Sequence, residues 1–289
     1  MSHNIKVLHI EPTDACNLAC PLCARETDPL FIKQQSAHLT IEQIMQVVNL
    51  TDIKNLNKMF MCGNYGDPAA GKHTLEIFKY FREINPNIIL GMNTNGSLQN
   101  TKWWTELASI LTQPCDYVVW SIDGLENTNH VYRINSNWKK IMTNAQSFIK
   151  AGGSAHWDML VYKHNEHQVD LCQQTAKELG FKWFRAKISK RPLANKLEYP
   201  ILWSARSYEA GNIECHALKE QSIYIDAHGR RSPCCWLGSR QSNFITDISE
   251  VQETWNSKHP NTICVNTCST RNNISNFDSQ WRREVNLCN

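Results

Sequence analysis

The 289-residue sequence lacks any uninterrupted apolar run near the roughly 18 residues that a membrane-spanning helix needs. It also lacks an excess of either charge, since 30 Lys and Arg residues stand against 27 Asp and Glu residues. A net charge of +3 argues against a large nucleic-acid interface, which requires many basic side chains. The first residues do not show the basic and then apolar layout of a secretory signal. We therefore expect a cytoplasmic protein that uses neither a membrane nor a nucleic acid.

Cysteine, in contrast, is abundant and unevenly placed. Disulfide frameworks are rare in the reducing cytosol, so the 12 cysteines favour metal binding over covalent cross-links. Three of them, Cys16, Cys20 and Cys23, lie in one short segment. Three isolated cysteines are expected to be ordinary packing residues, namely Cys62, Cys115 and Cys172. The last quarter of the chain holds the other six, which are Cys215, Cys234, Cys235, Cys264, Cys268 and Cys288.

Short β-type segments alternate with segments of helical periodicity up to residue 188. Strands are expected at 6–10, 58–62, 88–92, 117–122, 156–162 and 183–188. This alternation predicts a parallel sheet with crossover helices. Six strands are too few for the closed eight-stranded barrel, so residues 1–190 are predicted to form an α/β fold of the partial (β/α)6, TIM-like barrel type.

Residues 191–289 do not continue this rhythm. The segment that holds Pro192, Pro200 and Gly211 is typical of a linker. Beyond it, a hairpin is expected around 222–225, with a turn at His228 and Gly229. The sequence thus predicts a small Cys-rich extension after the barrel.

An unusual motif follows each of the first five predicted strands. The first strand leads to the three clustered cysteines. The next four lead to Gly63-Asn64-Tyr65-Gly66-Asp67-Pro68, Asn93-Thr94-Asn95-Gly96, Ser121-Ile122-Asp123-Gly124 and Lys163-His164-Asn165. Because the carboxyl ends of parallel strands meet on one face, these motifs predict one ligand-binding site.

The pattern Cys16-x3-Cys20-x2-Cys23 fits a [4Fe–4S] cluster that keeps one iron open. A structural zinc site would need a fourth ligand from elsewhere in the chain, and that alternative stays open. With this pattern directly after a first barrel strand, the sequence resembles the radical S-adenosylmethionine (SAM) superfamily over about residues 6–190. The resemblance implies that the open iron binds SAM. It also implies reductive cleavage of SAM to a 5′-deoxyadenosyl radical that abstracts hydrogen from a substrate.

The resemblance further implies residues that bind SAM. Tyr65-Gly66-Asp67-Pro68 is similar to the family's Gly-Gly-Glu-Pro element, so Gly66 and Asp67 are expected at the SAM ammonium group. Aspartate is one methylene shorter than the usual glutamate, so this contact is expected to pass partly through backbone carbonyls. Arg133 is expected at the SAM carboxylate and Leu22 beside adenine. The remaining polar positions expected to line the pocket are Asn95, Ser121 and Asp123. Taken singly, these motifs are also common turns, and an arginine can simply be solvated.

The second cysteine group resembles the SPASM/twitch extensions that follow radical SAM barrels. The pattern Cys215-x13-Gly229-x4-Cys234 matches their opening hairpin, and Cys264-x3-Cys268 would supply two more thiolates. These four cysteines imply one auxiliary [4Fe–4S] cluster. The full SPASM pattern carries another Cys-x2-Cys, which this chain does not have, so a second auxiliary cluster is not expected. Replacement of one ligand by Cys235 or Cys288 stays open, as does a four-cysteine zinc site.

Short motifs such as Pro233-Cys234-Cys235-Trp236 resemble those of radical SAM enzymes that modify ribosomally made precursor peptides. Among these enzymes, the pattern is most similar to spliceases, which excise a tyramine unit and leave an α-keto-β-amino residue. The resemblance implies a precursor peptide as substrate and an external electron donor. Because the first strand starts near residue 6, a separate small protein is expected to present the peptide. The alternatives are a radical SAM dehydrogenase of small alcohols and a noncatalytic metal-binding scaffold.

Overall fold

A computed structural model describes residues 5–31, 36–189, 197–201, 212–238, 245–268 and 285–286. Its strands form one sheet in the order β8-β7-β1-β2-β3-β4-β5-β6-β9. From β7 to β6 all neighbouring strands are parallel. The strands are β1 (Val7–Ile10), β2 (Lys58–Met61), β3 (Ile89–Thr94), β4 (Tyr117–Ser121), β5 (Ala155–Val161), β6 (Trp183–Ile188), β7 (Ser222–Ile225), β8 (Arg231–Ser232) and β9 (Val285–Asn286). The α/β partial barrel predicted from the sequence is confirmed.

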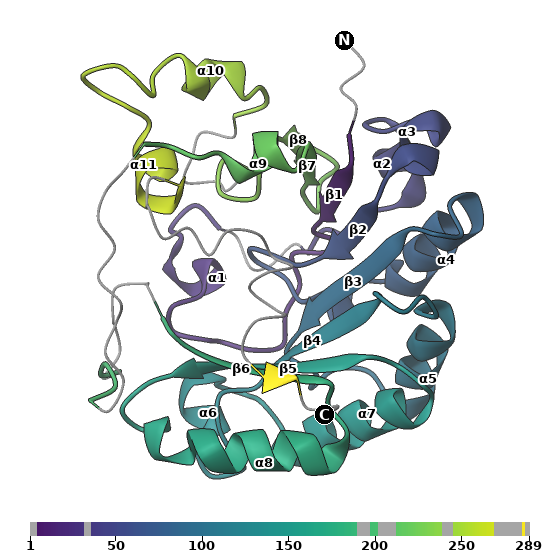
Figure 1. The fold of residues 1–289 in the computed structure, drawn as a ribbon, viewed down its shortest axis with the longest axis vertical. Helices are drawn as coiled ribbons and strands as arrows, with labels where there is room; N and C mark the ends of the chain where they lie inside the picture. Colours follow the sequence, from purple (N-terminus) through teal and green to yellow (C-terminus); the bar gives the residue numbers. More distant parts are fainter. Residues whose placement is uncertain are drawn as a thin grey trace.

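Helices cover the convex face of this sheet. Figure 1 shows α4, α5, α7 and α8 side by side along that face, while the opposite face is open toward α1. The helices of the barrel region are α1 (Ala24–Thr27), α2 (Ile41–Met45), α3 (Leu50–Asn55), α4 (Thr74–Ile84), α5 (Thr101–Ile110), α6 (Asn129–Tyr132), α7 (Trp138–Lys150) and α8 (Val169–Leu179), with 3-10 turns η1 (Pro68–Ala70) and η2 (Glu166–Gln168). Within the described ranges, no helix combines the length and apolar character needed to cross a membrane.

Local sequence explains where these helices begin and what they bury. Thr40 and Gln43 form a capping box at the start of α2: the Thr40 hydroxyl accepts from the Gln43 N–H, and the Gln43 side-chain oxygen accepts from the Thr40 N–H. In α7, Ile141, Ala145 and Phe148 are buried against the sheet, as their helical spacing predicts. The main apolar core therefore lies between the sheet and its convex-face helices.

The concave face carries polar and aromatic side chains, because alternate residues of each strand point there. His9 stacks on Phe60 with ring centroids 4.3 Å apart, and its edge contacts Tyr224. The Lys58 ammonium lies over the rings of Phe60 and Tyr117, 5.2 and 5.0 Å from their centroids. Lys58 and Tyr117 begin β2 and β4, whereas His9, Phe60 and Tyr224 lie one residue before the ends of β1, β2 and β7, so this belt extends along the concave face to the motif loops.

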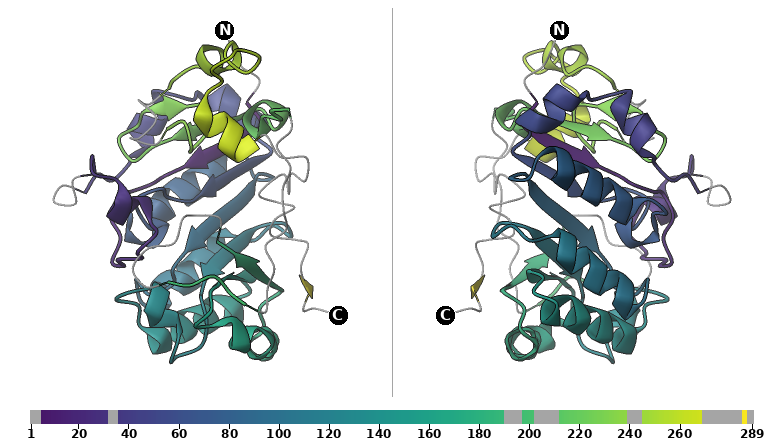
Figure 2. Two further views of the ribbon diagram at one scale, coloured as in Figure 1. Left: turned by 90° about the vertical axis from the view of Figure 1, so that its left-hand side faces the viewer. Right: turned by 90° about the vertical axis from the view of Figure 1, so that its right-hand side faces the viewer.

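The C-terminal segment returns to the first strand of the sheet. The predicted hairpin is confirmed as β7 and β8, and β7 pairs in parallel with β1, with Val7 opposite Ser222. Both views of Figure 2 show the yellow-green residues 245–268 at the same end of the molecule as the purple β1. Its helices are α9 (His216–Lys219), α10 (Ser249–Gln252) and α11 (Thr262–Cys268). Of the residues that suggested a linker, Pro192 and Gly211 lie outside the described residues.

Candidate functional site

The loop between β1 and α1 brings three thiols together. Cys16, Cys20 and Cys23 follow β1, and the Cys23 N–H donates to the Cys20 carbonyl (3.0 Å). Burial raises the pKa of Cys16 to about 12, and Asp67 and the neighbouring Cys20 and Cys23 act in the same direction. Burial likewise raises the pKa of Cys20 to about 11. Thiols in such a place become thiolates only where a cation compensates their charge.

The donor set fits an iron–sulfur cluster. It contains thiols alone, on one loop, and a thiolate is the ligand that such clusters require. Among the described residues, these three cysteines included, no three His, Cys, Asp or Glu side chains are arranged to hold a single metal ion. Cys16, Cys20 and Cys23 are the residues that would hold a cluster at this end of the barrel.

Asn95, which follows β3, braces this loop. Its amide donates to Asn17 Oδ1 (3.1 Å) and to Cys16 Sγ (3.7 Å). Asn17 in turn donates to the Ser97 hydroxyl (2.9 Å). The side chain expected in the SAM pocket thus reaches the first cysteine directly and fixes its orientation.

Asp67 already uses both carboxylate oxygens inside the protein. Its Oδ1 accepts from the Ala69 N–H (2.9 Å) and the Thr94 hydroxyl (2.9 Å), and its Oδ2 accepts from the Asn95 N–H (2.6 Å). The carboxylate therefore caps η1 and ties β2 to β3. Three of the roughly four acceptor positions of this carboxylate are thus used inside the protein.

Gly66 is required by packing. A Cβ built there would lie 1.9 Å from the Thr13 carbonyl oxygen, so no other residue fits without moving the cysteine loop. Tyr65, which stands where the family usually has glycine, is buried, stacks on Phe31 and donates its hydroxyl to Asp28 Oδ2 (2.6 Å). Tyr65, the residue that departs from the family pattern, thus has a stacking partner and a hydrogen-bond partner of its own.

Sequence reasoning missed Glu11, at the carboxyl end of β1. Its side chain is buried, and Oε1 accepts from the backbone N–H groups of Tyr65 (2.7 Å) and Gly66 (3.0 Å). Its Oε2 accepts from the Tyr224 hydroxyl of β7. An acid directly after an apolar strand was the available signal, but its partners come from distant segments.

Glu11 is expected to titrate near neutral pH. Burial raises the pKa of Glu11 from 4.5 to about 7, against the hydrogen bonds from Tyr224, Tyr65 and Gly66 that lower it. Because the folded-state pKa is the higher one, the stability contributed by the protonated form is present below pH 4.5 and is lost as the pH rises through 7. Infrared difference spectra should show a carboxyl band that disappears with a midpoint near 7 and is missing in Glu11→Gln. A band that survives this substitution would contradict the assignment.

Asp123 and Arg133 form a buried ion pair beside the second cysteine. Arg133 Nε donates to Asp123 Oδ2 (2.6 Å), while Asp123 Oδ1 accepts from the Leu160 N–H (2.6 Å). Arg133 Nη1 lies 4.0 Å from Cys20 Sγ. Burial raises the pKa of Asp123, although the Arg133 charge acts in the opposite direction. The pair places one fixed cation next to the cysteine loop.

Leu22 and Ser121 are the two remaining predicted residues of this site. In the sequence, Leu22 lies two residues after Cys20, and Ser121 lies two residues before Asp123. Leu22 is buried in a small apolar cluster with Tyr132 and Tyr162, separate from the main core. Ser121 ends β4, is partly exposed and lies opposite Asp158 of β5. The sequence-predicted residues of the first site therefore all lie at the carboxyl ends of β1 to β4 or in the loops that follow them.

Four thiols of the C-terminal segment also lie together. Burial is the main cause that raises the pKa values of Cys234, Cys264 and Cys268, and the nearby Cys215 acts in the same direction on all three. Burial raises the pKa of Cys234 to about 12 and that of Cys268 to about 11. The Glu214 N–H donates to the Cys268 carbonyl (3.0 Å), which joins α11 to the start of α9. The structure brings together the four residues expected at the auxiliary cluster.

Cys235 faces a different direction from Cys234. Its pKa is raised by burial first, then by Cys234, Cys62 and Glu11, and its carbonyl accepts from the Asn64 amide in the loop after β2 (2.8 Å). Cys288 lies outside the described residues. Among the three isolated cysteines, Cys172 is buried as expected, but Cys115 is exposed because it stands in the loop before β4.

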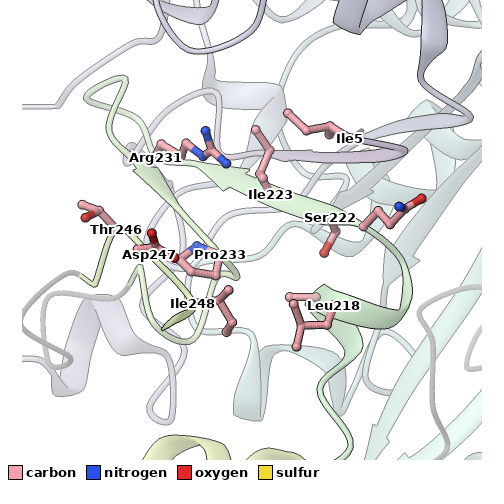
Figure 3. Close-up of a pocket in the computed structure, with 11 residues that line it drawn as sticks. Ile5, Leu218, Ser222, Ile223, Arg231, Pro233, Thr246, Asp247 and Ile248 are labelled. Carbon is pink, nitrogen blue, oxygen red and sulfur yellow. The ribbon is translucent and has the colours of Figure 1, made fainter. Parts of the chain in front are cut away.

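A separate cavity of about 440 Å³ lies beside the hairpin and holds none of the predicted site residues (Figure 3). Ile223, Leu218 and Ile248 form its apolar walls, and Arg231 and Asp247 lie among its polar lining.

The fold and the thiol loop define an α/β partial barrel built to hold an iron–sulfur cluster at the carboxyl ends of its strands. Residues 10–173 match the model of the radical SAM superfamily. The chain belongs to this superfamily, whose members use a [4Fe–4S] cluster and SAM, and it is a radical SAM enzyme.

Two curated relatives match part of the chain. FeMo cofactor biosynthesis protein NifB of Methanocaldococcus jannaschii is 29% identical over 126 residues, which is 40% of this chain and 40% of that protein. A probable GTP 3′,8-cyclase of Thermococcus kodakarensis is 35% identical over 91 residues, which is 31% of this chain and 27% of that protein. The chain thus spans less than half the length of these relatives.

Solved structures are similar in fold. Streptococcus suis SuiB bound to S-adenosylmethionine has a TM-score of 0.59 and 15% identity, covering 89% of this chain and 68% of that one. The anSMEcpe structure with bound AdoMet has a TM-score of 0.56 and 18% identity, covering 79% of this chain and 74% of that one. The similarity to both extends beyond the residues matched by the family model.

Proposed function

We propose that this enzyme abstracts hydrogen from a ribosomally made precursor peptide and carries one auxiliary [4Fe–4S] cluster. The observation that most supports this proposal is the group formed by Cys215, Cys234, Cys264 and Cys268 beside the barrel. A peptide substrate is supported by the fold similarity to SuiB bound to precursor peptide SuiA, which covers 88% of this chain with a TM-score of 0.58.

In this proposal Cys16, Cys20 and Cys23 hold the first cluster. When bound there, the cluster and SAM supply a 5′-deoxyadenosyl radical. Arg133, fixed by Asp123, offers a cation for the SAM carboxylate. Backbone carbonyls of the Tyr65–Asp67 loop receive the ammonium group, since Asp67 already uses three of its roughly four acceptor positions inside the protein.

The remaining proposed residues shape the SAM pocket. Leu22 offers an apolar surface for adenine, and its neighbours Tyr132 and Tyr162 keep it in place. Asn95 orients Cys16, and Ser121 offers a hydroxyl at the end of β4. The peptide enters from the open concave side of the sheet, presented by a small partner protein, and an external donor supplies electrons.

The finer proposal is a splicease reaction that removes a tyramine unit and leaves an α-keto-β-amino residue. Anaerobic enzyme with SAM, a reductant and candidate precursor peptides should give 5′-deoxyadenosine and a peptide product of lower mass by mass spectrometry. Turnover of small alcohols with unchanged peptides would instead favour a dehydrogenase. Absence of 5′-deoxyadenosine under all these conditions would leave a noncatalytic scaffold.

Cys234→Ala tests the auxiliary cluster. In the proposed auxiliary cube a protein thiolate binds each iron, so loss of one thiolate destabilises it and should lower the iron and sulfide per chain toward roughly half of the wild-type value. Iron analysis and electron paramagnetic resonance of anaerobically purified protein measure this. Cys115→Ala, at an exposed cysteine, is the matched control and should keep full iron content. Zinc in place of the lost iron, or no loss at all, would contradict the proposed cluster.

A further inference from the structure

A buried hydrogen-bond network joins the two cysteine groups. Its centre is Glu11, which holds the Tyr65 and Gly66 N–H groups with one oxygen and the Tyr224 hydroxyl with the other. Glu11 and Tyr224 are both almost fully buried, at 1% and 0% exposure. In such surroundings a lost donor is not replaced by water, so the geometry of this centre is tightly determined.

Asn64 adds a second connection between the same segments. Its amide donates to the Cys235 carbonyl (2.8 Å) and to the Tyr224 hydroxyl (3.4 Å). Its own carbonyl accepts from Cys23 Sγ (3.8 Å). One residue therefore contacts the third cysteine of the first group and the backbone next to Cys234 of the second.

The hairpin that carries Tyr224 lies between two proposed auxiliary ligands in the sequence. Cys215 precedes β7, with α9 between them, and Cys234 follows β8 after Pro233. A cluster held by both residues therefore fixes the two ends of the hairpin. The position of the Tyr224 hydroxyl against Glu11 is then determined together with that cluster.

We propose that Tyr224 and Asn64 are positioning residues that couple occupancy of the auxiliary site to SAM affinity, through Glu11 and the Tyr65–Gly66 backbone. This inference rests on the proposed function, because it requires the auxiliary cluster. The same loop backbone is proposed to receive the SAM ammonium group, so a shift of Glu11 is transmitted to SAM directly. Linkage is reciprocal, so SAM must strengthen retention of the auxiliary cluster by the factor by which the cluster strengthens SAM binding.

A double-mutant cycle with Cys234→Ala and Tyr224→Phe tests the coupling. SAM dissociation constants are measured by equilibrium dialysis on the anaerobic protein, which requires no turnover. Loss of the auxiliary cluster in Cys234→Ala should weaken SAM binding about 5-fold or more, within the usual range of coupling between sites. In the Tyr224→Phe background the same substitution should change the SAM dissociation constant much less.

A merely structural role for Tyr224 would weaken SAM binding equally with or without Cys234, and additive effects would overturn the inference. Tyr80→Phe, which removes a tyrosine hydroxyl bonded to Met45 on the convex side, is the matched control. In the Tyr80→Phe background, Cys234→Ala should change the SAM dissociation constant as much as it does in the wild type. If Tyr224→Phe does not fold, Asn64→Ala removes the second connection and should reduce the coupling in the same cycle. Full coupling in that variant would overturn the inference as well.

The reciprocal measurement uses a chelator. In the wild type, SAM should slow the loss of auxiliary iron, and this protection should shrink in Tyr224→Phe. A wild type with iron for a single cluster would instead refute the proposed function itself. Two clusters with no protection by SAM would refute only the coupling.

Discussion

Replacing Cys20 by alanine should reduce 5′-deoxyadenosine formation to the level seen without enzyme. The three thiols of this loop are the complete set of protein ligands expected for the first cluster, and a cube that keeps one iron open for SAM has no ligand to spare. Because Cys20 is only 7% exposed, an external thiol does not replace it easily. Chromatographic quantification of 5′-deoxyadenosine, with iron analysis of the same sample, measures the effect.

Cys172→Ala is the matched control, since it removes a buried thiol of α8 that packs in the main core. It should cost stability but keep SAM cleavage and iron content. Retained SAM cleavage in Cys20→Ala would refute the assignment of the loop. Colourless wild-type protein with zinc on Cys16, Cys20 and Cys23 would refute the cluster.

Arg133→Met should lower the free energy of unfolding by about 3–5 kcal/mol, because it leaves the Asp123 carboxylate buried without its cation. The Asp123 side chain is 0% exposed, and its second oxygen is held by the Leu160 N–H. Burial already raises the pKa of Asp123, so in the variant this group will take up a proton more readily. The loss should therefore grow as the pH rises, since ionisation then becomes harder to avoid.

Anaerobic urea unfolding, monitored by circular dichroism at two pH values, measures this effect. The double variant Arg133→Met, Asp123→Asn should recover part of the stability, since its amide no longer requires a cation. Lys79→Met removes a surface ion pair (2.6 Å to Glu106) and should cost less than about 1 kcal/mol. Equal losses in Lys79→Met and Arg133→Met would show that the buried pair has no special weight.

The strands and their order of appearance could be predicted because local periodicity determines them. β2 and β6, for example, lie within one residue of their expected bounds, and the Thr40 capping box starts α2 as its sequence pattern indicates. The cysteine motifs could also be located, because the carboxyl ends of parallel strands necessarily converge.

The partners of individual polar groups could not be predicted in the same way. Nothing in the local pattern shows that β7 pairs with β1, because that contact joins opposite ends of the chain. The occupation of both Asp67 oxygens depends on Thr94 and Asn95 from another strand. Glu11 stayed unnoticed for the same reason, since its donors come from the loop after β2 and from β7.

The pairing of β1 with β7 has a consequence for biosynthesis. On the ribosome, β1 emerges early and remains an unprotected edge until residues 222–225 have been translated. Until then the nascent chain also lacks Tyr224, whose hydroxyl donates a hydrogen bond to Glu11 in the folded protein. We therefore expect iron–sulfur delivery to a chain that has already left the ribosome, and pulse-labelled nascent chains should carry no iron.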